Sequence, residues 1–138
     1  MPHWLPLALI ALVAWGITGN TQKISTNCIS KEFAFIGFSV AFIPVALLTL
    51  ALFPVRAALP AQVVALGLLS GALNGFGALT SFAAFEKGAK SAVAVPLMYL
   101  YPLITVLLAW GLLHERISAA HWAGIGLAPL AAWLLSSE

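Results

Sequence analysis

The sequence predicts an all-α membrane protein with five transmembrane helices. Hydrophobic residues make up 62% of the 138 residues and charged residues only 7%, whereas soluble domains usually hold roughly 45–50% and roughly 25%. The mean hydropathy is +1.06. Six basic and four acidic residues are too few to cover the large surface of so small a soluble protein. The apolar residues form long unbroken blocks, which differ from the alternating segments of about ten residues in a transmembrane β-barrel.

A spanning helix needs about 20 mostly apolar residues, and five blocks reach or approach that length. They cover residues 4–23, 33–53, 61–85, 92–113 and 119–135. Pro54 ends the second block. The fifth is short, but flanking side chains can extend to the interface. The first block lacks a basic leader and a clean cleavage site, so we expect a retained helix rather than a signal peptide. We treat residues 1–138 as a single domain.

Nearly all charges lie between these blocks and set the orientation. With five spans, one side of the membrane receives four basic residues and the other side two. The first set is Lys23, Lys31, Lys87 and Lys90; the second is Arg56 and Arg116. The positive-inside rule favours a chain with its N-terminus outside and its C-terminus inside, in the inner (plasma) membrane. The small bias also allows dual topology.

Ionisable residues are missing from the middle of every predicted span, which argues against an enzyme. An intramembrane hydrolase needs a nucleophile with an activating base at depth, but His3, His114 and His121 all lie at helix ends. No metal-ligand spacing is present, and we expect no cofactor. The single Cys28 cannot form an intrachain disulfide. The net charge of +2 rests on very few residues and gives no reason to expect nucleic acid as a partner.

The third block is the most patterned. Glycines four residues apart form a face that another helix can approach closely: Gly67, Gly71 and Gly75. A polar stripe at helical spacing runs beside them: Ser70, Asn74, Gly77 and Ser81. Asn74 stands near mid-membrane, either as a hydrogen-bonding contact between helices or as part of the lining of a polar cavity.

The fourth block contains Pro96 and Pro102 with Tyr99 and Tyr101 between them. Each proline removes a helix hydrogen bond and bends the segment. The segment is either a kinked packing helix or a broken helix of the kind that forms midplane sites in transporters. In the first block, Trp15 lies deeper than an interfacial aromatic residue usually does. The fifth block carries a small-residue packing stripe: Ala120, Gly124, Ala128 and Ala132.

Together these motifs resemble the EamA-like domain of the drug/metabolite transporter superfamily. The C-terminal half carries the resemblance through Gly88-Ala89, Pro96-Leu97, Tyr101-Pro102, Glu115-Arg116, and Trp122 followed by Gly124. Ala14-Trp15-Gly16 fits the start of the same family, so the resemblance covers essentially the whole chain. His114 stands where the family pattern more often has Gly.

The resemblance implies a five-helix repeat. Most members carry two inverted repeats around a central cavity, so it also implies a homodimer or a pair with a paralogous half-transporter. The family's cavity is lined mainly by the first, third and fourth helices. By resemblance, therefore, the substrate-binding residues are Trp15, Asn74, Ser81, Tyr99 and Tyr101.

Our hypothesis is a half-size transporter, embedded in the lipid bilayer, that carries a small metabolite by alternating access. Hydroxyls, one amide and aromatic faces suit a neutral, zwitterionic or aromatic solute. The alternative is a non-transporting accessory or assembly protein that uses its GxxxG face to bind a partner. The two hypotheses differ in what Asn74 and Tyr101 do, which is either to contact solute or to pack.

Overall fold

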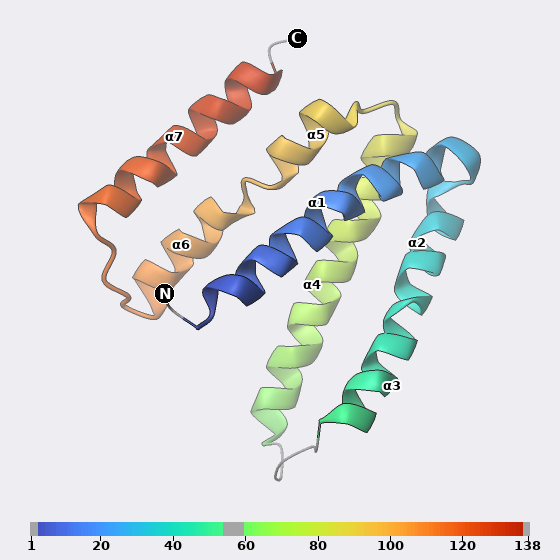
Figure 1. Cartoon of the computed structure of the whole chain (residues 1–138), viewed down its shortest axis with the longest axis horizontal. Coiled ribbons are helices and arrows are strands. Elements are labelled where there is room, and N and C mark those ends of the chain that lie inside the picture. The colour runs from blue at the N-terminus through green and yellow to red at the C-terminus, as the bar shows by residue number, and fades with distance from the viewer. Residues whose placement is uncertain (1–2, 54–59, 137–138) are drawn as a thin grey trace. The chain divides into compact units, whose positions relative to one another are not determined.

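The computed structural model describes residues 3–53 and 60–136, and helices are the regular secondary structure of these residues (Figure 1). In chain order the helices are α1 (Leu5–Cys28), α2 (Lys31–Val40), α3 (Phe42–Leu52), α4 (Ala61–Glu86), α5 (Ser91–Met98), α6 (Tyr101–Leu112) and α7 (Ala119–Ser136). α2 with α3, and α5 with α6, each correspond to one predicted block.

Four of the five predicted blocks form helical segments long and apolar enough to cross a membrane. They are Leu5–Cys28, Lys31–Leu52, Ala61–Glu86 and Ser91–Leu112. The fifth block forms α7, whose apolar stretch, Trp122–Leu134, is shorter. The predicted all-helical membrane class is therefore confirmed, and the chain is a multi-pass membrane protein.

The first helix continues five residues beyond the predicted end at Lys23, to Cys28. Its polar residues remain helical because their hydroxyls donate to carbonyls of the preceding turn, where they satisfy their own hydrogen bonds. Thr18 donates to Ala14 at 2.9 Å and Ser25 donates to Gln22 at 2.8 Å. The polar run is therefore the last part of α1 rather than a loop.

The second segment begins at Lys31 and breaks at Ala41, where we had expected one continuous helix over 33–53. Pro44 explains the break, because it has no N–H to bond the carbonyl of Val40 and its ring crowds that carbonyl. Ala41 keeps right-handed helical angles (φ −63°, ψ −18°), so the interruption is slight. α3 ends at Leu52; Pro54, the expected terminator, lies outside the described residues.

The fourth segment breaks between Pro96 and Pro102, as predicted. α5 ends at Met98, and α6 begins at Tyr101. Tyr99 and Leu100 form the connection, with their N–H groups bonded to Val95 and Leu97. The predicted bend is therefore confirmed.

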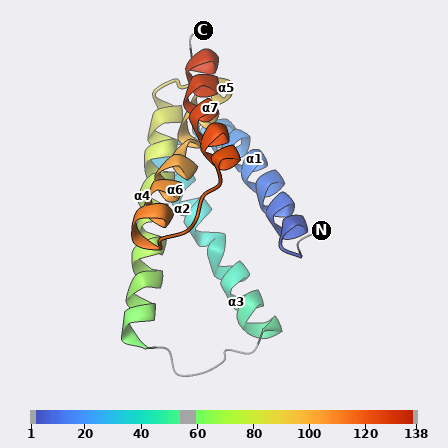
Figure 2. The same cartoon turned by 90° about the vertical axis from the view of Figure 1, so that its left-hand side faces the viewer.

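The chain divides into two compact units, residues 1–87 and 88–138. In the first unit, α2 packs on α4, and α1 contacts both. The helices meet where α1 and α4 end and α2 begins, while α3 and the first half of α4 run apart (Figure 2). Buried residues mark the meeting point: Gly19, Ala34, Phe82 and Phe85.

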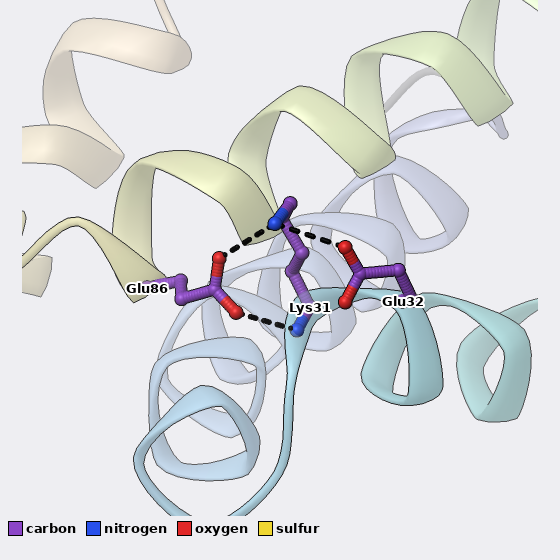
Figure 3. A network of polar contacts seen from close by, with 3 residues as sticks. All are labelled: Lys31, Glu32 and Glu86. Atoms are coloured by element: carbon purple, nitrogen blue, oxygen red, sulfur yellow. Dashed lines mark hydrogen bonds and ion pairs between the residues drawn. The ribbon is translucent and has the colours of Figure 1, made fainter.

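Polar contacts of Lys23, Lys31, Glu32 and Glu86 join the helices at this meeting point, and we call this group the polar clasp. Glu86, at the end of α4, accepts hydrogen bonds from the backbone N–H of Lys31 at 3.0 Å and from its ammonium group at 2.8 Å. Figure 3 shows that ammonium group between Glu86 and Glu32, the latter at 2.9 Å. Lys23 also donates to the carbonyl of Phe85 at 3.0 Å, a favourable place for a cation because the C-terminus of a helix is partly negative.

In the second unit α5 packs against α7. Ala94 and Ala132 are buried. Trp110 of α6 meets Trp122 of α7 edge to face, with ring centroids 6.2 Å apart. Between these helices His114 adopts a left-handed backbone with φ +54°. Side chains of the second unit therefore pack both at the α5 end and at the α6–α7 connection.

Candidate functional site

A pocket of about 380 Å³ lies in the second unit beside the break between α5 and α6. One wall is formed by Tyr99, Leu100, Pro102, Leu103 and Val106, and the other by Gly124, Ile125 and Ala128 of α7. This volume is at the small end of the range for small-molecule sites, about 300–1,000 Å³. Of its lining residues, only Tyr99 has a polar side chain.

The break itself creates polar backbone beside this pocket. Pro102 has no N–H, so the carbonyl of Met98 loses the donor that a continuous helix would supply. No backbone N–H among the described residues replaces it. In a membrane such a group has to be satisfied by protein or by a water-filled cavity. The break is therefore a place where polar contacts are needed at depth.

The two predicted tyrosines are brought together here. Their ring centroids are 6.1 Å apart with a tilt of 46°, which is within the range of favourable aromatic pairs. Tyr99 lines the pocket, whereas Tyr101 is 51% exposed and is not part of the lining. The sequence therefore located the pair, and the structure distinguishes a pocket residue from its neighbour.

In the first unit the predicted Asn74 and Ser81 share one face of α4, since they are seven residues, or about two turns, apart. The Ser81 hydroxyl is half-buried and donates to the carbonyl of Gly77 at 2.9 Å. Asn74 is exposed, and no hydrogen bond to its amide is found among the described residues. Its hydrogen-bonding capacity is thus open to another molecule or chain.

The glycine face beside Asn74 is also open. A Cβ atom placed at Gly67, Gly71 or Gly75 would meet nothing within 4 Å. These glycines therefore make no close helix contact inside the described part of the chain.

Four predicted site residues lie near the middle of their helical segments. Trp15 is close to the centre of α1, and it is 47% exposed. Asn74 is at the centre of α4, and Tyr99 and Tyr101 are near the centre of residues 91–112. Ser81 lies closer to the end of its helix. In transporters, solute sites are commonly built near the middle of spanning segments.

Sequence reasoning missed two features. Gly124 and Ala128, assigned to a packing stripe, line the pocket at Tyr99. A second pocket in the first unit, of about 330 Å³, combines the polar side of α1 with aromatic rings of α2 and α4. Its only sequence signal is the presence of hydroxyl and amide side chains at Thr21, Gln22 and Ser25. No group of three His, Cys, Asp or Glu side chains gathers as a metal site among residues 3–53 and 60–136.

Comparison with known families gives one match. The sequence model of the EamA-like transporter family matches residues 3–137, which is nearly the whole chain. Neither the curated proteins nor the solved structures give a match.

Proposed function

Because the chain belongs to the EamA-like transporter family, whose members are membrane transporters of the drug/metabolite type and not enzymes, we propose that it moves a small neutral, zwitterionic or aromatic metabolite across the inner membrane. It acts by alternating access as one half of a dimer, with its N-terminus outside and its C-terminus inside. The five predicted spanning segments form one repeat of that assembly.

The observation that carries this proposal is the broken α5–α6 segment with Tyr99 in its pocket. Interrupted helices near the bilayer midplane are a common way to build a solute site, since they expose polar backbone where it lines a cavity. Here the break, a tyrosine and a concave surface coincide. We propose that solute binds to Tyr99 with Tyr101 beside it. From the family resemblance we also propose Trp15, Asn74 and Ser81 of the first unit as substrate-binding residues.

The solute class follows from the side chains present. The lining of this pocket contains no Asp, Glu, Lys or Arg among the described residues. A solute with a net charge would have to leave water without a counter-charge, which is costly. A neutral or zwitterionic solute that hydrogen-bonds to a hydroxyl and stacks on rings avoids that cost.

Pairing with a second repeat is supported by the open face of α4. An unpaired amide in apolar surroundings costs roughly 1–3 kcal/mol by protein mutational data, and small-residue faces in membranes are where helices approach closely. Asn74 and the adjacent glycines have neither kind of contact within the described chain. We therefore propose that a second copy, or a paralogous half, covers this face.

The test is solute flux in proteoliposomes after the pocket has been filled. Gly124 lines the pocket, and a Cβ placed there meets nothing within 4 Å, so Gly124→Leu fills space without forcing the backbone to move. We expect the flux per folded protein to fall about tenfold or more, a loss of about 1.4 kcal/mol or more in transition-state terms.

Gly126→Leu is the matched control. Gly126 lies two residues further along α7, is equally open, and is not part of the pocket lining. It should retain flux. Equal loss in both variants would mean that helix changes in general impair the protein, and equal retention would remove this pocket from the transport path. The accessory-protein alternative would be favoured if no metabolite stabilises the folded protein against heat and the protein transports none.

A further inference from the structure

The second pocket points to a binding site separate from the proposed transport site. We propose that the α1–α2–α4 pocket binds a small amphipathic amine, with the ammonium group on α1 and the apolar part on the rings of α2 and α4. This inference does not depend on the proposed transport function, because none of the proposed substrate-binding residues lines this pocket.

The wall on α1 is rich in hydrogen-bond acceptors. The Thr21 hydroxyl donates to the carbonyl of Thr18 at 2.9 Å, and the Ser25 hydroxyl donates to Gln22 at 2.8 Å. Their hydrogens are therefore used within the helix, while oxygen lone pairs remain to accept a hydrogen bond. The Gln22 amide also lines the pocket and adds a carbonyl oxygen as an acceptor beside its NH2 donor. Such a wall selects a ligand that brings N–H donors.

The opposite wall is aromatic. Phe33, Phe38 and Phe82 line the pocket. Phe82 is buried, and Phe38 holds it edge to face with ring centroids 5.8 Å apart. The Phe33 ring is 71% exposed. A cation within about 6 Å of such ring faces is attracted by their quadrupole, and an apolar group packs on the same surface.

The charges nearby do not select an anion. Lys31 is held by Glu32 and Glu86, and Lys23 is bonded to the carbonyl of Phe85. Neither Lys23 nor Lys31 is among the lining residues of the pocket, and the ammonium group of Lys31 is paired with two carboxylates. The lining therefore offers an anion no cationic side chain, and its hydroxyl and amide oxygens favour an amine.

Gly37 gives a way to close the pocket. It is a lining residue on α2, and a Cβ placed on it meets nothing within 4 Å. Gly37→Leu should occupy the cavity while the backbone stays as it is. Gly111→Leu in α6 is the matched control, because Gly111 is equally open and lies outside the pocket.

The experiment measures direct binding of 2-phenylethylamine to the purified protein in dodecyl maltoside micelles. We expect saturable binding, with 2-phenylethanol weaker and phenylacetate weaker still. Gly37→Leu should weaken amine binding about tenfold or more, and Gly111→Leu should leave it unchanged. Ser25→Ala, which removes one acceptor and little volume, should weaken it by about two- to tenfold.

Added lipid distinguishes two sources of the ammonium group. Competition by phosphatidylethanolamine, but not by phosphatidylglycerol, would identify a lipid headgroup as the occupant; no competition by either would identify a free amine. The proposal is overturned if the amine does not bind saturably, if phenylacetate binds as well, or if folded Gly37→Leu and Ser25→Ala both bind like the unaltered protein. A loss of flux in the Tyr99 pocket leaves these outcomes unchanged, so the two proposals fail separately.

Discussion

Replacing His114 by glycine should stabilise the protein, which is unusual for a histidine-to-glycine change. His114 follows the end of α6 and has φ +54°, the left-handed region. This conformation turns the chain so that the N–H of Glu115 reaches the carbonyl of Ala109 at 3.2 Å. A side chain with a Cβ atom is strained there, whereas glycine is not.

The magnitude can be worked from two opposing terms. Left-handed angles cost a residue with a Cβ atom roughly 1–2 kcal/mol, and histidine falls toward the lower end because it is enriched in this region. Glycine gives the unfolded chain extra freedom, which costs about 0.4–1 kcal/mol. Position 114 lies outside α6, so no helix propensity is lost. We therefore expect His114→Gly to raise the free energy of unfolding by about 0.5 kcal/mol.

His114→Ala is the matched control, since it removes the imidazole and keeps the strain. The assay is unfolding in mixed micelles with increasing denaturant, followed by helical circular dichroism. Gly88 has φ +97°, so Gly88→Ala should destabilise the protein by about 1 kcal/mol once the lower freedom of the unfolded chain is subtracted. If His114→Gly is no more stable than His114→Ala, left-handed backbone strain at residue 114 does not lower the free energy of unfolding.

Four further predictions concern the proposed site, the dimer, the orientation and the contacts of Glu86. Asn74→Ala and Tyr101→Phe should each lower flux per folded molecule about two- to tenfold, for loss of one hydrogen bond; unchanged specific flux in both would remove them from the site. Gly71→Leu should shift the protein from dimer to monomer in crosslinking without unfolding it, and an unaltered protein that transports as a monomer would contradict this. Reporter fusions at Glu138 should be found inside or on both sides, and the orientation is wrong if they are only outside. Glu86→Gln keeps a carbonyl oxygen that can accept a hydrogen bond from the Lys31 N–H, so this variant should unfold at a higher denaturant concentration than Glu86→Leu. Equal midpoints would show that this hydrogen bond does not contribute to stability.

Hydropathy alone located the helices because a segment in lipid has to satisfy all its backbone hydrogen bonds internally. The third predicted block, 61–85, differs from α4 by one residue. The break at Ala41 was missed although Pro44 is visible in the sequence, because the apolar run continues through it. The extension of α1 was missed because its end is polar, and hydropathy does not register hydroxyls that bond within the helix, as Ser25 bonds to Gln22.

The contacts between helices could not be predicted in the same way. Lys31 and Glu86 are 55 residues apart, and Lys23 and Phe85 are 62 apart. Interhelical contacts in lipid depend on packing and specific polar groups rather than on hydrophobicity, so an apolar pattern carries no signal for them. The tyrosine pair was found because its prolines mark the break locally. The role of Gly124 depends on which helix lies opposite, which one sequence does not reveal.

In the first unit the polar clasp and the proposed substrate-binding residues lie at different positions along the helices. The described interhelical hydrogen bonds of α1, α2 and α4 lie at one end, through Glu86 and Lys23. Trp15 and Asn74 lie near the centres of α1 and α4, away from the helix ends that the clasp joins. A small rotation about the clasped end would change the distance between these two residues. Alternating access requires movement of this kind, in which packed helices rock about a fixed contact.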